Sequence, residues 1–283
     1  MRRLRFLPFL KHNKAASYTL SAMIMTAVTV ALVVAAFAYA YQMLDQQRGV
    51  SEWEIARKSI LAYNDALENV AWKPGAIRST RFTAQYGYLQ LIPPAAGNSI
   101  TISATVNGVP ESLPSATYPI KTGIIKYWLS TKYVSFDPNY ESYILGNNSS
   151  LISSSSDSYG RSVINQQTGL VSMTLDYRVR AMRTSVINVS NVQTNYVDIW
   201  VIKLSMLAPN AWSYVSEFDL QAQTLSITTV SHRFTGVTNQ TSVISVRIGS
   251  TTASKVPVTL DLGSTHTGTV VYNVVVADVQ VKV

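Results

Sequence analysis

The chain has no cysteine among its 283 residues. This absence excludes disulfides, thiol catalysis and metal sites built from cysteine. Histidine is almost as scarce: beyond His12 only His232 and His266 occur, and neither has a carboxylate or a second histidine at the spacing of metal ligands. The HExxH and GxSxG motifs and a phosphate-binding glycine-rich loop are also missing. The sequence therefore predicts a protein that is not an enzyme, with no catalytic residues, no bound metal and no cofactor.

Charged residues make up only 13% of the chain, and most of the net charge of +8 comes from one end. Five of the 23 basic residues lie in the first 14 positions, so residues 15–283, with 18 basic and 15 acidic residues, carry a net charge of only +3. Positive charge just before an apolar helix stays on the cytoplasmic side of a membrane. The charge therefore indicates membrane topology, and we expect no nucleic-acid partner.

A long uncharged segment follows the basic residues. No charged residue occurs between Lys14 and Asp45, and residues 17–41 are predominantly apolar. As a helix this stretch measures about 37 Å, which is enough to cross a bilayer core of roughly 30 Å. We expect a single membrane-spanning helix with its N-terminus inside the cell and the rest of the chain outside.

The helical pattern continues beyond the apolar segment. Six apolar residues recur at spacings of three and four, as on one face of an amphipathic helix: Trp53, Ala56, Ile60, Tyr63, Leu67 and Val70. Pro74 and Gly75 then end the helix. The pattern predicts one helix over 17–72 whose second half packs against the following domain through this apolar stripe. The alternative is a membrane helix and a separate soluble helix that are joined near Gly49.

After Pro74 the apolar residues alternate with polar ones, as they do in half-buried strands. The alternation is clearest in four ranges: 100–106, 171–181, 244–248 and 275–283. The pair Asn107-Gly108, which follows the first of them, is a strong hairpin signal. Abundant Ser, Thr, Val and Tyr also favour strands, and this composition is typical of a β-rich domain outside the cell.

Taken together, these patterns predict an α+β fold. A long N-terminal hydrophobic α-helix is followed by a mostly antiparallel, β-sandwich-like head over 73–283. Pro209–Asp219 interrupts the alternation, and we expect a short helix there. If the head divides into two subdomains, the boundary is expected near 209–222.

Glycosylation is expected on the head. Four asparagines satisfy the N-x-[ST] rule: Asn147, Asn148, Asn188 and Asn239. The first two lie in the polar, serine-rich stretch Gly146–Gly160, which predicts an exposed loop. On the outer side of a membrane, such a loop is a favourable place for a bulky sugar.

Three explanations fit the apolar segment. A cleaved secretory signal would end near 38–40, but the apolar run is longer than the roughly 7–15 residues of such a signal. A plain membrane anchor fits the length and the charges. The third explanation is a helix that also packs against other helices, because Ala27, Ala31 and Ala35 form a row of small residues at four-residue spacing.

The segment KAASYTLSAMIMTAVTVALVV, from Lys14 to Val34, resembles the N-terminus of archaeal type IV pilin-like proteins. In that family a prepilin peptidase removes a short basic leader on the cytoplasmic side, and the apolar helix is kept, first in the membrane and then in the core of a filament. The resemblance implies a leader over 1–16, with the cut after Ala16 or after Ala15. The cleavage region that it implies consists of Lys14, Ala15, Ala16 and Ser17.

One departure concerns assembly. Bacterial type IV pilins, which share this design, carry a glutamate at the fifth position of the mature chain, where this sequence has Ser21 or Leu20. A docking mechanism through that glutamate therefore does not carry over, although archaeal relatives often lack it. The stretch from Ala66 to Leu91 also resembles the helix-to-head junction of large archaeal pilin-like proteins, whereas the rest of the head matches nothing in the family.

The resemblance implies a structural subunit, major or minor, of an archaeal type IV pilus-like surface filament. Its expected partners are copies of itself or other pilins, which meet through the N-terminal helix, together with the membrane and the prepilin peptidase. The large head favours a minor or adhesive role. The alternative is a membrane-anchored extracellular β-domain that binds or adheres without polymerising.

Overall fold

The computed structural model describes five stretches of the chain: 13–113, 119–189, 192–207, 211–263 and 266–283. For residues 13–17 and 189 it describes the backbone only. By its contacts the chain forms two units, Met1–Arg48 and Gly49–Val283.

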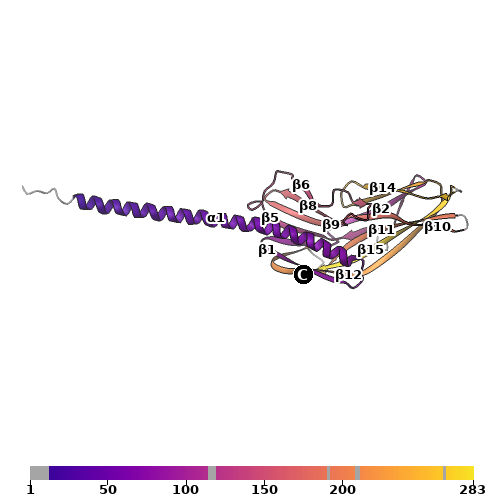
Figure 1. Cartoon of the computed structure of the whole chain (residues 1–283), viewed down its shortest axis with the longest axis horizontal. Helices are drawn as coiled ribbons and strands as arrows, with labels where there is room; N and C mark the ends of the chain where they lie inside the picture. Colours follow the sequence, from indigo (N-terminus) through magenta and orange to yellow (C-terminus); the bar gives the residue numbers. More distant parts are fainter. Residues whose placement is uncertain (1–12, 114–118, 190–191, 208–210, 264–265) are drawn as a thin grey trace, which may run out of the picture. The chain divides into compact units, whose positions relative to one another are not determined.

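One helix, α1, spans Asn13–Ala71 (Figure 1). It continues through Gly49, so the structure has one helix where the sequence also allowed two. A Cβ at Gly49 would lie 2.3 Å from Cδ1 of Tyr133, which means that glycine permits a close approach of this loop to the helix. The helix ends where Pro74 and Gly75 predict, within one residue, and Gly75 has a φ of 78°.

The end of α1 is fastened to the sheet. The carbonyl oxygen of Val70 accepts hydrogen bonds from the Lys73 backbone N–H at 2.8 Å and from the Thr224 hydroxyl at 2.7 Å. Both donors satisfy an acceptor that the helix itself leaves unpaired at its last turn. The last turn is therefore held by a residue far along the chain.

Most strands belong to one ten-stranded sheet. In spatial order they are β6 (Glu141–Leu145), β8 (Gly160–Gln167), β9 (Leu170–Tyr177), β5 (Ile124–Ser130), β1 (Ile77–Ile92), β12 (Trp212–Val237), β15 (Gly268–Lys282), β11 (Val192–Met206), β10 (Val179–Val189) and β7 (Leu151–Ile152). Neighbours are antiparallel except for β11 with β15 and β10 with β7, which are parallel.

A second sheet has five strands. Its order is β14 (Ser254–Thr259), β13 (Thr241–Ile248), β2 (Asn98–Val106) and β3 (Val109–Ser112), and β4 (Ile120–Thr122) also pairs with β2. All its pairs are antiparallel. Asn107 and Gly108 link β2 to β3 with φ values of 50° and 81°, which confirms the predicted hairpin.

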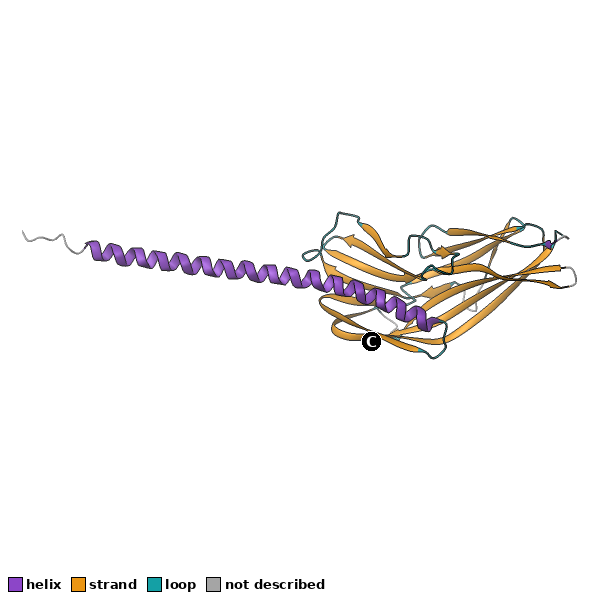
Figure 2. Cartoon of the chain, viewed as in Figure 1, coloured by secondary structure: helices purple, strands orange, loops and turns teal. Residues whose placement is uncertain are grey.

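Two hydrophobic cores lie on opposite faces of the ten-stranded sheet. Along β11, Val197, Ile199 and Val201 belong to the core shared with the second sheet, whereas Ile202 and Leu204 belong to the core shared with α1. The helix from Trp53 onward covers one face and the five-stranded sheet covers the other, as the layers of the head show in Figure 2. This arrangement confirms the predicted α+β fold with a mostly antiparallel, sandwich-like head.

The expectation of a short helix over Pro209–Asp219 is wrong. Residues from Trp212 onward form β12, which pairs with β1. The alternation breaks there because the register of the two strands shifts between Ala84 and Leu89, and Ser216 has a φ of 73°, as in a bulge. A bulge interrupts a period of two without ending the strand, so the sequence pattern resembled the end of a strand.

Two other expectations concern the serine-rich stretch and the boundary between subdomains. The stretch Gly146–Gly160 is not simply an exposed loop, because Ser150 and both residues of β7 are buried in its middle. The boundary near 209–222 stays a prediction, and residues 208–210 lie outside the described residues.

Candidate functional site

The apolar segment, which we define as residues 18–44, is exposed over its whole length. Every one of its side chains is exposed, and the largest are strongly so: Tyr18 is 80% and Phe37 is 71% exposed. The described part of the chain has one helix long and apolar enough to cross a membrane, with a mean hydropathy of 2.3 in its most apolar window and none of that window buried. A signal sequence near an N-terminus passes the same test.

Two polar residues of the apolar segment, Thr26 and Thr29, suit a medium without water. The hydroxyl of Thr26 donates to the Ala22 carbonyl at 2.9 Å, and the hydroxyl of Thr29 donates to the Met25 carbonyl at 2.8 Å. Both hydroxyls therefore have their acceptor inside the helix. The segment carries no charge, and these two hydroxyls are paired within the helix, as suits a lipid-facing helix.

The residues expected to pack helices together lie within this segment. Ala27, Ala31 and Ala35 are all exposed. The cleavage region falls where less is described: Lys14, Ala15, Ala16 and Ser17 lie in α1, but their side chains are outside the described residues, as is the leader from 1 to 12. Helix packing and cleavage both stay predictions.

The six residues of the apolar stripe lie in the core between α1 and the ten-stranded sheet. Their exposed fractions are between 0 and 4%: Trp53, Ala56, Ile60, Tyr63, Leu67 and Val70. Trp53 packs against Tyr127 of β5 with ring centroids 6.2 Å apart, and Tyr63 meets Phe82 of β1 edge-on, also at 6.2 Å. Full burial of a side chain such as Ile60 stabilises the fold by roughly 1.5–3 kcal/mol.

A buried carboxylate on the same helix was missed by the sequence analysis. Glu52 is 5% exposed, and its oxygens accept hydrogen bonds from the backbone N–H groups of Gln85, Tyr86 and Gly87 at 2.9–3.1 Å. The hydroxyl of Tyr127 donates a fourth bond at 2.6 Å. These residues of β1 lie in its register shift against β12, where the ladder leaves backbone groups free. Glu52 therefore binds the irregular part of β1 to the helix.

The surroundings of Glu52 are closely fitted to it. Burial, and then the hydrogen bond to Glu52, raise the pKa of Tyr127 well above its ordinary value, so the phenol stays a proton donor. A Cβ at Gly87 would lie 2.4 Å from the Tyr127 hydroxyl oxygen, so only glycine fits there. A signal was present in the sequence, because Glu52 lies four residues before Ala56 and therefore on the buried face of the helix.

A second carboxylate fastens the helix to the serine-rich stretch. Glu68 Oε1 accepts hydrogen bonds from the Ser158 hydroxyl, from the Asn64 side-chain amide at 3.1 Å and from the Gly160 backbone N–H at 3.0 Å. Gly160 allows this approach, since a Cβ there would lie 1.9 Å from Asn64 Oδ1. Glu52 and Glu68 thus hold the C-terminal part of α1 at two separate places in the head.

All four sequon asparagines are exposed, namely Asn147, Asn148, Asn188 and Asn239. Asn147 Oδ1 accepts hydrogen bonds from the Ser149 backbone N–H at 2.9 Å and from Arg178 Nη1 at 3.2 Å. The amide nitrogen, which is the atom that carries a glycan, has no hydrogen-bond partner among the described residues. The side chain of Ser190, which completes the third sequon, lies outside the described residues. Accessibility is required for glycosylation, and glycosylation itself stays a prediction.

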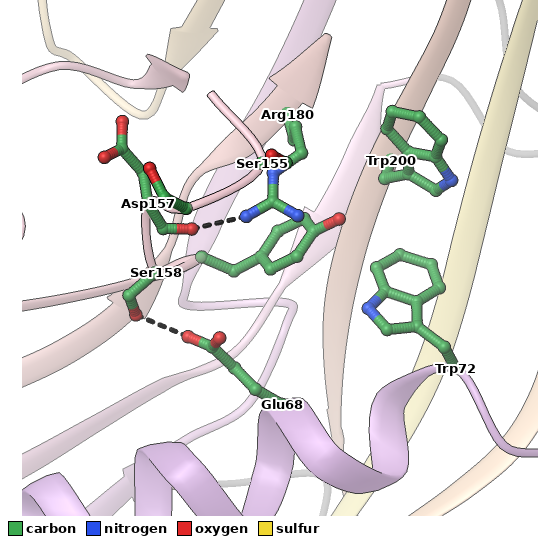
Figure 3. A pocket seen from close by; sticks show the side chains of 9 residues that line it. Glu68, Trp72, Ser155, Asp157, Ser158, Arg180 and Trp200 are labelled. Carbon is green, nitrogen blue, oxygen red and sulfur yellow. Dashed lines mark hydrogen bonds between the residues drawn. The ribbon is translucent and has the colours of Figure 1, made fainter. Parts of the chain in front are cut away.

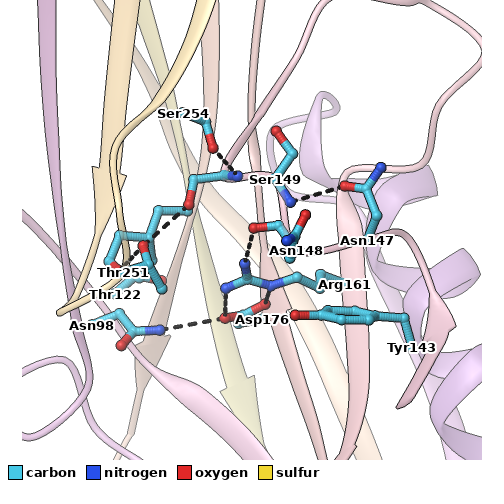
Figure 4. Close-up of polar contacts among 12 residues, drawn as sticks. Asn98, Thr122, Tyr143, Asn147, Asn148, Ser149, Arg161, Asp176, Thr251 and Ser254 are labelled. Carbon is cyan, nitrogen blue, oxygen red and sulfur yellow. Dashed lines mark hydrogen bonds and ion pairs between the residues drawn. The ribbon is translucent and has the colours of Figure 1, made fainter. Parts of the chain in front are cut away.

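A buried ion pair supports the loop that carries the first two sequons (Figure 4). Arg161 and Asp176 are cross-strand partners on β8 and β9, joined by two hydrogen bonds of 2.8 and 2.6 Å. Asn98 of the second sheet donates to the same carboxylate at 3.5 Å, and Arg161 also reaches the Asn148 carbonyl at 3.4 Å. The pair therefore links both sheets and the sequon loop, and we assign it a structural role.

Comparisons of the chain with protein-family models, with curated proteins and with solved structures found no match.

Proposed function

We propose that the chain is a structural subunit, major or minor, of a type IV pilus-like surface filament. A prepilin peptidase would remove the leader after Ala15 or Ala16, and α1 would hold the subunit in the membrane before assembly. The observation that carries the proposal is the apolar segment, residues 18–44, in which every side chain is exposed and none is charged. Such a surface is unstable in water and needs a cover that none of the described residues supplies.

The physical basis is a change of surroundings for one helix. In the membrane, lipid tails cover the apolar segment. In a filament, the same side chains would meet helices of other subunits, so apolar burial is kept while lipid is released. Because lipid is as apolar as leucine, close packing must favour the helix contacts, and the row of Ala27, Ala31 and Ala35 permits it.

The fastening of α1 to the head supports the same proposal. Force or movement applied to the helix is transmitted to the head through the buried stripe and through Glu52 and Glu68. A filament subunit needs such a junction, because its helix is fixed in the core while its head meets the surroundings. On this proposal the protein is not an enzyme and has no nucleic-acid partner, and its partners are pilin subunits, the membrane and the peptidase.

The mature N-terminus tests the proposal. We expect mass spectrometry of the protein from its native source to find a first residue of Ala16 or Ser17. Retention of Met1 would favour a membrane-anchored β-domain that does not polymerise, and a start at Tyr41 would indicate a secreted domain. Either result contradicts the filament proposal.

A substitution in the small-residue row gives a second test. We expect Ala31→Trp to insert into the membrane normally and to abolish filaments, because the indole keeps the helices apart. Val33→Trp is the matched control, since it lies on the opposite face of the helix and introduces the same side chain. Normal filaments from Ala31→Trp, seen by electron microscopy of the cell surface, would contradict the packed core.

A further inference from the structure

A pocket of about 440 Å³ lies at the C-terminal end of α1, inside the unit that begins at Gly49 (Figure 3). Its lining comes from four parts of that unit: the helix end with Glu68 and Trp72, the stretch Ser155–Tyr159, Arg180 on β10 and Trp200 on β11. The volume is in the range of small-molecule sites. Glu68, which bonds α1 to the serine-rich stretch, lines one side of the pocket.

The pocket has flat aromatic surfaces on one side. Trp72 and Trp200 lie near each other across from Ser155 and Ser158 in Figure 3. Trp72 also contacts Tyr159, with ring centroids 5.5 Å apart. Both indoles are half-buried, and neither indole N–H has an acceptor among the described residues. They therefore offer apolar faces and free donors to a ligand.

The other side of the pocket carries polar groups that can form further hydrogen bonds. Arg180 donates through Nη2 to the Asp157 main-chain carbonyl, and its Nε is buried without a partner among the described residues. The Asp157 side-chain carboxylate takes no part in this hydrogen bond. Glu68 receives its hydrogen bonds at Oε1, which leaves Oε2 unpaired within the described residues. Donors and acceptors consequently surround the aromatic faces.

This combination excludes several classes of ligand. Two carboxylates against one guanidinium give the lining a net charge of −1, which disfavours anions. For a quaternary ammonium ion, the guanidinium of Arg180 covers one of the three aromatic rings, Tyr159, at 3.9 Å, and its positive charge repels a second cation in the pocket. Purely apolar ligands would leave the serines and charged groups unpaired. A neutral ligand with one apolar face and a rim of hydroxyls meets each of these requirements.

We propose that this pocket binds a neutral saccharide. One pyranose ring would place its C–H face on the indole of Trp72 or Trp200, while its hydroxyls bond to Arg180, to the free oxygens of Glu68 and Asp157 and to the indole N–H groups. The site is independent of the filament function, because every lining residue belongs to the unit that begins at Gly49 and none to the apolar segment. Binding is expected whether or not the chain polymerises.

The test uses the full chain in nanodiscs, which avoids detergents with sugar headgroups. Saturation-transfer NMR would be run with glucose, mannose, galactose, N-acetylglucosamine and their linear oligomers, followed by calorimetry for any that bind. We expect at least one to bind, and Trp200→Ala to weaken binding by about tenfold. Trp128→Ala is the matched control, since this indole lies on the other face of the sheet, bonded to Gln90, and should leave affinity within about twofold.

A second variant guards against loss of the fold in Trp200→Ala. Ser156 is exposed at the edge of the pocket, so Ser156→Tyr narrows the site without removing a core contact. We expect it to keep the unfolding temperature of the wild type and to weaken sugar binding. The proposal is overturned if no sugar binds the wild type, or if Ser156→Tyr and a folded Trp200→Ala both bind as the wild type does. If tetramethylammonium or inorganic phosphate binds and no sugar does, the proposal that the ligand is a neutral saccharide is wrong.

The sugar could belong to free glycan or to glycan on another copy of this chain, and a separate arm distinguishes them. A chain with the four sequon asparagines changed to glutamine would be immobilised, and protein from the native source would be passed over it before and after enzymatic removal of its glycans. Capture that disappears on deglycosylation and on Trp200→Ala assigns the ligand to another copy. Binding of the oligomers alone assigns it to free glycan, and binding in neither arm contradicts the proposal.

Discussion

The two halves of helix α1 differ in what covers them. In the apolar segment, residues 18–44, every side chain is exposed, whereas the stripe from Trp53 to Val70 is at least 96% buried against strands of the head. The first half is uncharged and apolar on all sides, whereas the second half has a single apolar stripe among charged residues. Strands of the same chain cover the stripe of the second half, whereas no described residue covers the first half.

Polar groups follow the same division. Thr26 and Thr29 in the apolar segment bond to carbonyls of their own helix, whereas Glu52 and Glu68 in the covered half bond to β1 and to the serine-rich stretch. A helix that faces lipid satisfies its polar groups internally, and a helix that holds a domain uses them to reach it. Truncation of an apolar side chain should therefore destabilise the head in the covered half and leave it almost unchanged in the exposed half.

The largest effect on the head is expected from Leu67→Ala. The side chain is fully buried, so its loss should lower the free energy of unfolding of the head by about 2–5 kcal/mol. Leu32→Ala is the matched control: the same change at an exposed position should alter that free energy by less than about 0.5 kcal/mol. Urea unfolding followed by tryptophan fluorescence measures both, because all five tryptophans lie at Trp53 or beyond. Equal effects would mean that the head is held by something other than the stripe.

Glu52→Gln should have the next largest effect. One of its two acceptor oxygens becomes a donor that faces backbone N–H groups, so we expect a loss of about 2 kcal/mol in the unfolding free energy. Glu54→Gln is the control, since Glu54 is exposed and its only ion pair among the described residues is a 3.8 Å contact with half-buried Arg57. This change should alter the unfolding free energy by no more than about 0.5 kcal/mol. If the two variants unfold at the same urea concentration, Glu52 does not fasten β1 to the helix.

The smallest effect on stability is expected at Gly49, the first buried residue of α1 among those described. Its sign should depend on Tyr133. Gly49→Ala gains about 1 kcal/mol of helix propensity, but its Cβ meets the Tyr133 ring, so we expect a net loss of about 1 kcal/mol. In a Tyr133→Ala background the same change should become stabilising. Thermal unfolding of the four proteins tests this sign reversal, and a loss in both backgrounds would rule out the clash.

Local patterns predicted the elements that depend on nearby residues. The end of the helix at Pro74 and Gly75, the six buried positions spaced by three and four, and the Asn107-Gly108 hairpin all follow from residues within a few positions of one another. The order of the strands does not. In the parallel pair of β11 and β15, Gln193 lies opposite Gly268, and no local period indicates a pairing across that distance.

The sequence also did not predict the irregular backbone or the side chains that bond to it. The bulge near Ser216 imitated the end of a strand, and the role of Glu52 depends on the free N–H groups that such irregular backbone leaves in β1. The pocket is similarly hidden, because Trp72, Tyr159 and Trp200 come from three separate elements. Residues that act through long-range geometry could be placed on a buried face from sequence, but not assigned their partners.

The central claim is that other copies of the chain cover the apolar segment in its assembled state. Because the chain has no cysteine, Ala31→Cys provides a single thiol in the middle of that segment. Oxidative cross-linking of filaments sheared from the cell surface should give covalent dimers, while Val33→Cys on the opposite helix face should give fewer. Exclusively monomeric Ala31→Cys protein in the assembled fraction, with its thiol still reactive after unfolding, would contradict the claim.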